Sequence, residues 1–434
     1  IYIASKPLYV KHCIRAFGFC GSMQYFCMEE KIMSESFDVK LEAKTYKPDS
    51  SYRENSNIGD WETAYNRYLK DPDGFWDGIA KELTWFKPWD AVKEWKHPYA
   101  KWFVNAKTNI TFNCLDRHVN SELRNKVALI WRGEEEEQER IFTYRQLHRE
   151  VQRCANALKN LGIKKGDTVC IYMPLIPEHI VAMLACARIG AVHSVVYGGF
   201  GAAALNTRIR DASAKVVITA DVGYRRGKHV PLKSIVGDAV VNAPSVETIV
   251  VVRRTRPQVE LISEMEIDYY ELLNEAGKEC EPEVMDAEDP LFILYTSGTT
   301  GQPKGIVHTT GGYMVGTYYT TQYIFDMKAN DVHWCTADPG WITGHSYIVY
   351  GPLAAGATIL ITETVPDYPD PSIWWKIIEE FGVTIFYTAP TAIRMFMKFG
   401  EEWPNKANLD SLRIIGSVGA VSYTHLTLPT KRIV

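Results

Sequence analysis

The middle of the chain alternates short apolar runs with amphipathic stretches, and this alternation constrains the fold more than any other feature. The apolar runs are rich in β-branched residues, which is typical of buried strands. They are Lys126–Trp131, Thr168–Met173, Val192–Tyr197, Lys215–Ala220 and Thr248–Val252. Strands that alternate with helices favour a parallel sheet with helices on its faces. We therefore predict a fold of the α/β class.

One of the intervening helices has both of its ends marked. Thr143 and Gln146 have the spacing of a capping box, in which each side chain bonds the backbone N–H of the other residue. An apolar stripe follows at helical spacing: Leu147, Val151, Cys154, Leu158 and Leu161. Gly162 then stands where helices commonly end. The pattern predicts a helix between Thr143 and Gly162, and further helices are expected at 178–189 and 202–210.

The same rhythm returns after Pro290. Four more runs are predicted to be strands: Leu291–Thr296, His333–Ala337, Ala357–Thr362 and Thr384–Thr388. We predict two similar sheet-plus-helix subdomains, at residues 126–252 and 290–419, joined by a connecting segment at 253–289 and preceded by a segment at 33–125. The acidic run Glu134–Glu137 is most simply a solvated loop.

The two ends of the chain differ in character from the middle. The first residue is Ile1, and three of the nine cysteines precede Met33. We expect residues 1–32 to be translated from upstream of the true start, with a genuine extension as the alternative. Residues 420–434 fit no expected element, and we expect a non-native tail there, with a divergent terminus as the alternative.

Composition argues against several kinds of partner. Lys and Arg number 48 and Asp and Glu 52 in 434 residues, a formal charge of −4, so no nucleic acid or anionic membrane is predicted. No apolar run approaches the ~20 residues that span a bilayer. None of the nine cysteines forms a CxxC pair, so we predict no metal site and a reducing, cytoplasmic setting. The alternative is a signal peptide, because an uncharged stretch at 16–28 follows basic residues.

The segment Tyr295–Gly305 reads YTSGTTGQPKG and carries the clearest chemical signal. Glycines let the backbone approach a polyanion, hydroxyls add donors, and a lysine adds positive charge. The residues predicted to bind a nucleotide polyphosphate are Thr296, Ser297, Gly298, Thr299, Thr300, Gly301 and Lys304. The order of Lys304 and Gly305 is not that of a Walker A loop. The alternative is a Ser/Thr/Gly surface turn without a ligand.

This loop resembles the phosphate-binding loop of the adenylate-forming superfamily. Several other stretches resemble the AMP-forming acetyl-CoA synthetase family in particular: Asn113–His118, Val196–Phe200, Trp334–Tyr347, Tyr350–Leu353 and Trp374-Trp375. The resemblance runs from about Tyr46 to Gly419. It implies the large N-terminal domain of the adenylate-forming fold.

The resemblance also implies a reaction. Acetate would attack the α-phosphorus of ATP, with Mg²⁺, to give acetyl-AMP and diphosphate, and CoA would then displace AMP. Acetate is already ionised at neutral pH, so the first step needs no general base. Thr296 and Lys304 would serve that step as catalytic residues. Alternatives are a propionate–CoA ligase and a non-catalytic fragment that binds ATP and CoA.

Further site residues follow from the same resemblance. Arg225, Arg226, Gly227, Lys228, Thr343 and Asp367 would contact CoA. Ile342, Thr343 and Val418 would line the acyl pocket, and Gly419 would lie near the adenine. Arg226 stands where the family usually has Gly, and Asp367 where it often has Asn. The alternatives are a solvated basic turn at 225–228 and an ordinary core position for Ile342. His345 is expected to pack or orient.

The resemblance ends at Gly419, where the family continues into a pocket wall, a hinge and a small C-terminal lid domain. We expect these parts to be missing from the chain. Loss of a lid that completes a site and excludes water costs most of the rate, so weak or no activity is expected. The oligomeric state is left open.

Overall fold

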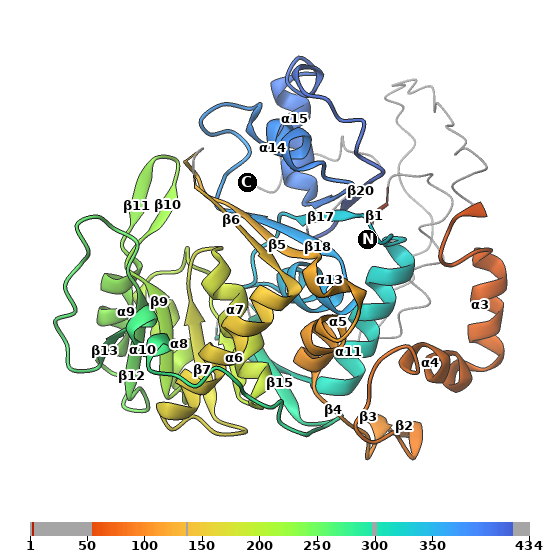
Figure 1. Cartoon of the computed structure of the whole chain (residues 1–434), viewed down its shortest axis with the longest axis horizontal. Coiled ribbons are helices and arrows are strands. Elements are labelled where there is room, and N and C mark those ends of the chain that lie inside the picture. The colour runs from red at the N-terminus through yellow and green to blue at the C-terminus, as the bar shows by residue number, and fades with distance from the viewer. Residues whose placement is uncertain (1, 4–53, 136–137, 297–301, 420–434) are drawn as a thin grey trace, which may run out of the picture.

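A computed structural model describes residues 2–3, 54–135, 138–296 and 302–419, and Figure 1 shows their arrangement. Within these residues, most strands form two seven-stranded sheets with helices around them. Both sheets are built mainly of parallel strands. The predicted α/β class is confirmed.

The first sheet contains, in spatial order, β13 (Glu266–Asp268), β12 (Thr248–Val252), β9 (Val216–Ala220), β7 (Thr168–Tyr172), β8 (Val192–Val195), β15 (Pro290–Thr296) and β16 (Lys304–Thr309). Neighbours from β13 to β15 are parallel, and β16 is antiparallel to β15. Their β-branched runs are buried on both faces, as parallel strands covered by helices require.

The second sheet contains, in spatial order, β1 (Tyr2–Ile3), β20 (Ile414–Ser417), β19 (Ile385–Thr388), β17 (Val332–Cys335), β18 (Thr358–Thr362), β5 (Val127–Arg132) and β6 (Glu139–Thr143). Neighbours from β20 to β5 are parallel. The two outermost strands, β1 and β6, pair antiparallel with their neighbours.

The two sheets share one connectivity. Across the first sheet, four strands lie side by side in the order β12, β9, β7, β8. In chain order these are the fourth, third, first and second of the four. The strands β17, β18, β19 and β20 are arranged in the same way across the second. The predicted similarity of the two blocks is thus confirmed at the level of topology.

The boundaries drawn from the sequence do not follow sheet membership, and this is a correction. The hairpin β5–β6 lies in block 126–252 but pairs with β18 of the second sheet. The hairpin β15–β16 lies in block 290–419 but pairs with β8 of the first sheet. Each sheet therefore ends in a hairpin from the other block of sequence. Within the connecting segment, Glu266–Asp268 adds an edge strand to the first sheet.

Helices cover both sheets (Figure 1). The longer ones are α3 (Trp61–Lys70), α4 (Pro72–Ala80), α6 (Tyr144–Asn160), α7 (Pro177–Arg188), α8 (Ala202–Asp211), α9 (Leu232–Val240), α10 (Tyr269–Asn274), α11 (Thr310–Tyr319), α14 (Ile373–Phe381) and α15 (Pro390–Phe399). Shorter pieces are α5 (Arg117–Val119), α12 (Ile342–Gly344), α13 (Gly351–Ala354) and the turns η1 (Phe112–Asp116), η2 (Glu122–Asn125), η3 (Thr320–Ile324), η4 (His345–Tyr350) and η5 (Pro404–Lys406). The remaining small strands are β2 (Ala91–Lys96), β3 (Tyr99–Val104), β4 (Lys107–Thr108), β10 (Gly223–Arg225), β11 (Lys228–Val230) and β14 (Met285–Asp286).

The predicted capping box begins α6. The Thr143 hydroxyl accepts from the Gln146 N–H at 3.3 Å, and Gln146 Oε1 accepts from the Thr143 N–H at 2.8 Å. The apolar stripe behind it is buried at Leu147, Val151, Cys154 and Leu158. Gly162 has a φ of +82°, the left-handed conformation that ends helices.

One continuous apolar core joins the two sheets. It holds strand residues such as Val169 and Ile171 of the first sheet together with Ile359 and Ile361 of the second. Helix α7 is buried along its whole length, charged residues included. The two blocks therefore pack as one body.

Two further findings bear on the composition. The six cysteines among the described residues are buried and unpaired. In the described part of the chain, no helix combines the length and apolarity needed to cross a membrane.

Candidate active site

The predicted site segments follow the carboxyl ends of parallel strands. In the first sheet, the hairpin β10–β11 follows β9, and the phosphate loop follows β15. In the second sheet, residues 342–343 follow β17, Asp367 follows β18, and residues 418–419 follow β20. Open α/β sheets bind ligands beyond the carboxyl ends of their strands. The fold thus places all of these segments where a site is expected.

The phosphate loop joins β15 to β16. Thr296 and Lys304 stand opposite each other at the end of this antiparallel pair, and both side chains are exposed. Beneath them the Tyr295 hydroxyl donates to Asp211 Oδ2 at 2.6 Å, which ties the hairpin to α8. Ser297, Gly298, Thr299, Thr300 and Gly301 lie outside the described residues.

The lysine of the loop has an exposed side chain. Within the described residues, no carboxylate pairs with the Lys304 ammonium. Its side chain is therefore available to an anionic ligand, which suits the role predicted for it.

The basic turn is the tip of the hairpin β10–β11. Arg225 and Lys228 pair across the hairpin, and Arg226 and Gly227 form its two-residue turn. Their φ angles are +55° and +69°, the left-handed values that two-residue hairpin turns favour. All four residues are exposed.

The turn contacts the second sheet's side of the molecule. Arg226 Nη1 lies 2.7 Å from Oδ2 of Asp367. A Cβ on Gly227 would lie 2.4 Å from the hydroxyl of Tyr368, so a larger residue would collide there. Asp367 keeps a second, buried oxygen, Oδ1, without a partner among the described residues. The two segments predicted to contact CoA are thus brought together, and the residues that depart from the family pattern pair with each other.

The acidic run Glu134–Glu137 was predicted to be a solvated loop. For Glu134 this prediction is wrong. The Glu134 carboxylate accepts hydrogen bonds from the N–H groups of Arg226 and Gly227, at 2.6 and 2.7 Å. Glu135 is exposed, and residues 136–137 lie outside the described residues. Glu134 therefore contacts the basic turn through its side chain.

A second contact between the sheets lies at the end of β17. A Cβ on Gly340 would lie 2.8 Å from the backbone of Tyr197, which follows β8. The Gly340 N–H donates to Asp338 Oδ1 at 2.7 Å. Burial raises the pKa of Asp338 to about 6, while the Gly340 N–H and Arg225 oppose this rise. Asp338 is thus a buried carboxyl group with a raised pKa at this contact between the two sheets.

Residues after this turn were predicted to line the acyl pocket. The Ile342 side chain is 41% exposed, which excludes the alternative that it is an ordinary core residue. Thr343 is half-buried beside it in α12. A Cβ on Gly344 would lie 2.3 Å from the Asp338 carbonyl oxygen, so this tight packing sets the position of α12.

The last predicted residues follow β20. The Val418 N–H donates to the Thr388 carbonyl at 3.0 Å. Gly419 is exposed and has a φ of +91°. Next to them Thr336 and Thr388 share a hydrogen bond of 2.7 Å between their hydroxyls, across the carboxyl ends of β17 and β19.

His345 was expected to pack, and its surroundings confirm this. It is fully buried, and its ring lies 4.3 Å from that of Phe292 and 5.5 Å from that of His193. Burial lowers its pKa to about 3. A neutral, enclosed imidazole of this kind supports the core behind the site.

The sequence reasoning missed Glu134, Asp338 and Tyr197 as members of this site. The Arg225 guanidinium donates to the Tyr197 hydroxyl at 3.2 Å. Asp338 and Tyr197 lie within stretches that resemble the family, one just after a predicted strand and the other at the end of one, so their position was an available signal. Glu134 carried no such signal, because its partner lies 92 residues away.

Among the residues that the structure describes, no group of three or more His, Cys, Asp and Glu could hold an ion. A magnesium ion bound here would therefore need ligands from elsewhere, and phosphate oxygens commonly supply them.

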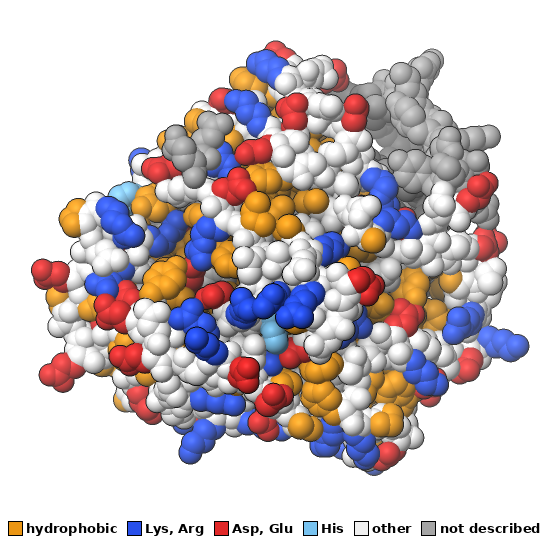
Figure 2. Space-filling model, in the orientation of Figure 1, with side chains coloured by type: hydrophobic (Ala, Val, Ile, Leu, Met, Phe, Trp, Pro, Cys, Tyr) orange, Lys and Arg blue, Asp and Glu red, His pale blue; other side chains and the backbone are white. Residues whose placement is uncertain are grey.

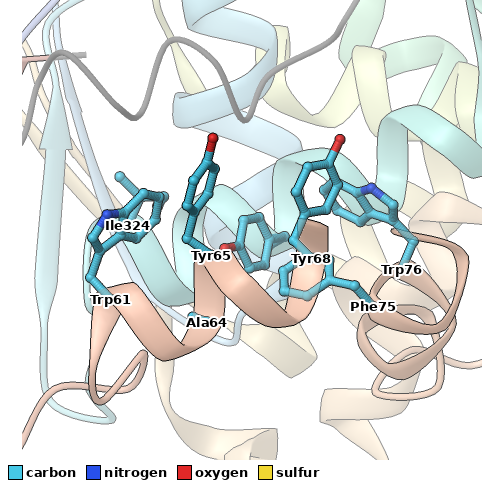
Figure 3. A pocket seen from close by; sticks show the side chains of 8 residues that line it. Trp61, Ala64, Tyr65, Tyr68, Phe75, Trp76 and Ile324 are labelled. Atoms are coloured by element: carbon cyan, nitrogen blue, oxygen red, sulfur yellow. The ribbon is translucent and has the colours of Figure 1, made fainter. Parts of the chain in front are cut away.

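Two hollows lie away from this site. One lies among aromatic side chains of α3 and α4 (Figure 3), and its volume of about 20 Å³ suits no more than a water molecule. The other, of about 700 Å³, lies beside α6, where Figure 2 shows a row of basic side chains. Its basic lining residues are Arg124, Arg145, His148, Arg149, Arg153 and Lys278. No predicted site residue lines either hollow.

Two protein families match this chain. The family described as "AMP-binding enzyme" matches residues 115–429, and the one described as "Acetyl-coenzyme A synthetase N-terminus" matches residues 61–114. Together they cover most of the predicted extent of 46–419. The first match also reaches ten residues into the segment 420–434 that was expected to be non-native.

Curated relatives agree with these families. "Acetyl-coenzyme A synthetase" of Rubrobacter xylanophilus is 52% identical over 88% of this chain and 59% of its own length. The protein of the same name from Methanothrix thermoacetophila is 56% identical over 80% of this chain and 52% of its own length. "Acetyl-coenzyme A synthetase 2" of Pseudomonas aeruginosa is 51% identical over 84% and 57%. The chain thus spans between 52% and 59% of the length of these relatives.

Proposed function

The chain belongs to the family of AMP-binding enzymes, and on this premise we propose that it carries the ATP- and CoA-binding residues of an acetate–CoA ligase. The reaction converts ATP, acetate and CoA into acetyl-CoA, AMP and diphosphate through an acetyl-adenylate. The relatives' printed names favour acetate as the acid. The setting that we propose is the cytoplasm, with acetate, ATP and CoA as small-molecule partners and with no nucleic acid or membrane.

One observation carries the proposal. The segments expected to contact CoA, 225–228 and Asp367, lie 141 residues apart in the chain and meet through the ion pair of Arg226 and Asp367. This ion pair joins a loop beyond the carboxyl ends of the parallel strands in one sheet to a loop beyond those in the other. The same edge of the first sheet bears Thr296 and Lys304. A nucleotide, an acid and a thiol can therefore reach one region of the molecule.

The proposed residues act mainly by positioning and by stabilising charge. Acetate is an ionised nucleophile at neutral pH, so no side chain has to remove a proton from it. In the proposed site, Lys304 and Thr296 hold the phosphates of ATP, and a Mg²⁺ ion held by those phosphates would neutralise part of their charge. Ile342, Thr343 and Val418 bound the acyl group, and Gly419 lies beside the adenine. Preorganised donors around the phosphates are the main source of rate in such transfers.

The test is acetate-dependent exchange of labelled diphosphate into ATP by the purified 434-residue chain. Exchange that requires acetate, and is slower with propionate, supports the acetate ligase. Faster exchange with propionate supports the propionate alternative. Binding of ATP and CoA without exchange restricts the chain to the binding part of the reaction. Absence of both binding and exchange contradicts the proposal.

A further inference from the structure

The tip of the hairpin β10–β11 has the form of an anion-binding site. Arg226 and Gly227 both have left-handed φ angles, +55° and +69°. Successive N–H groups in such a turn point to one side and form a concavity that binds anions. The exposed side chains of Arg225, Arg226 and Lys228 surround it with positive charge.

Two carboxylates of the chain itself occupy this tip. Glu134 accepts both N–H groups of the concavity, at 2.6 and 2.7 Å, one with each oxygen. Asp367 takes the guanidinium of Arg226 at 2.7 Å. Lys228 has no carboxylate partner among the described residues. The arrangement copies the way in which a phosphate group would engage two amides and a guanidinium.

Releasing the Glu134 carboxylate from the turn requires little free energy. Burial is the main cause of the raised pKa of Glu363, and the negative charge of Glu134 adds to the rise, so the two carboxylates repel each other. The adjacent Glu135 is also acidic and is exposed to water. Glu134 is itself only partly buried, and ion pairs and hydrogen bonds near the surface contribute little to stability.

We propose that Glu134 fills the turn at Arg226-Gly227 as an internal substitute for a ligand phosphate, and that the CoA nucleotide displaces it on binding. A phosphate monoester carries more negative charge than a carboxylate and offers three oxygens. It can therefore take both N–H groups and the Arg226 guanidinium at once. Glu134 lowers the affinity for CoA. Anions that bind the turn less tightly than Glu134 do not displace it. This inference rests on the proposed CoA-binding role of the turn.

The experiment uses calorimetry to compare CoA binding by the wild-type chain and by two variants. Glu134→Gln removes the charge of the internal substitute. Glu139→Gln removes an equal charge from the start of β6, the strand after the loop that holds Glu134. Its side chain is exposed and makes no bond to the turn among the described residues. We expect Glu134→Gln to bind CoA about three- to tenfold more tightly, from the loss of one competing surface interaction. Glu139→Gln changes the affinity less than twofold, and pantetheine, which lacks the phosphates, gains nothing from either variant.

Equal or weaker CoA binding by Glu134→Gln would overturn the inference, because Glu134 would then support the turn instead of competing for it. A second readout separates this result from failure of the proposed function. In protein labelled with ¹⁵N-glycine, the amide of Gly227 reports directly on its acceptor. If CoA binds neither form, the CoA role is wrong, and inorganic phosphate decides the inference alone. Phosphate must then shift the Gly227 signal at lower concentration in Glu134→Gln than in wild type, and an equal response rejects the inference.

Discussion

Arg254 and Glu363 form a two-pronged ion pair that joins the carboxyl end of β12 in one sheet to that of β18 in the other. The two hydrogen bonds, Nη1 to Oε1 and Nη2 to Oε2, measure 2.8 and 2.6 Å. Glu363 is only 2% exposed at its side chain and Arg254 11%. Burial raises the pKa of Glu363 and Arg254 opposes that rise. The pair therefore fixes the two sheets beside the proposed CoA site.

Arg254→Met leaves Glu363 buried without its partner. We expect it to lower the free energy of unfolding by about 3–5 kcal/mol, the usual cost of breaking a buried pair. The double variant Arg254→Met/Glu363→Met removes both charges and should regain most of this loss. Urea unfolding of the three proteins provides the measurement. A loss below about 1 kcal/mol in the single variant would show that water reaches Glu363.

Thr143→Ala removes one half of the capping box of α6. The free energy of unfolding should fall by about 1 kcal/mol, as for other N-cap threonines. Thr143→Ser keeps the oxygen that accepts from Gln146 and is the matched control. Equal losses in both variants would assign the effect to the lost methyl group and not to the cap.

Local structure was predictable here wherever it depends on neighbouring residues. The run Thr248–Val252 forms a strand with those bounds, and the capping box at Thr143 forms as predicted. In both cases the decisive interactions are burial of β-branched side chains or bonds within four residues. Such signals are present in a single short stretch of sequence.

Pairing between distant strands was not predictable in the same way. Strand β5 lies next to β18, although about 230 residues separate Leu129 from its partner Ile359. Its apolar pattern suits any buried parallel strand, so it carried no information about which sheet it would join. The site shows the same limit. The resemblance indicated Arg226 and Asp367 separately, but their ion pair depends on how two loops meet.

Lys304→Ala tests the phosphate loop. If the lysine holds the phosphates of ATP, its loss should weaken ATP binding about 10- to 100-fold, since charge-assisted hydrogen bonds contribute roughly 1.5–3 kcal/mol. Lys398→Ala removes an equal charge from the exposed end of α15 and should leave ATP affinity unchanged. Fluorescence titration with ATP measures both. Unaltered affinity in Lys304→Ala would remove this lysine from the proposed site.

Gly344→Ala tests the packing that positions α12. The new Cβ would lie 2.3 Å from the Asp338 carbonyl oxygen, so the backbone must move. We expect a loss of about 1–3 kcal/mol in unfolding free energy, as for other overpacked sites. Gly237→Ala is the matched control, because its Cβ meets no atom within 4 Å in α9. That change should stabilise the protein by about 0.5–1 kcal/mol. Calorimetric melting of the two variants should show opposite shifts.

Buried histidines give the protein a predictable dependence on pH. Burial lowers the pKa of His118, His179 and His333 to about 4, below the ordinary value of 6.5. Between pH 6.5 and 4 the unfolded chain therefore binds protons that the folded chain does not, and the free energy of unfolding falls as pH falls. Asp338 acts in the opposite direction, because its raised pKa lets the folded chain bind an extra proton between pH 3.8 and about 6.

The histidines outweigh Asp338 and also Glu363, whose pKa burial raises as well. Stability should therefore fall by several kcal/mol, on the order of 5, between pH 7 and 5. Urea unfolding at pH 7.5, 6.5 and 5.5 measures the slope. His333→Gln should flatten it below pH 6.5 by about 1.4 kcal/mol per pH unit, the effect of one proton. The same change at the exposed His97 should leave the slope unaltered. A stability that stays level or rises from pH 7.5 to 5.5 would mean that the folded chain admits protons to these imidazoles, and the core around them would then have to be more open than its packing indicates.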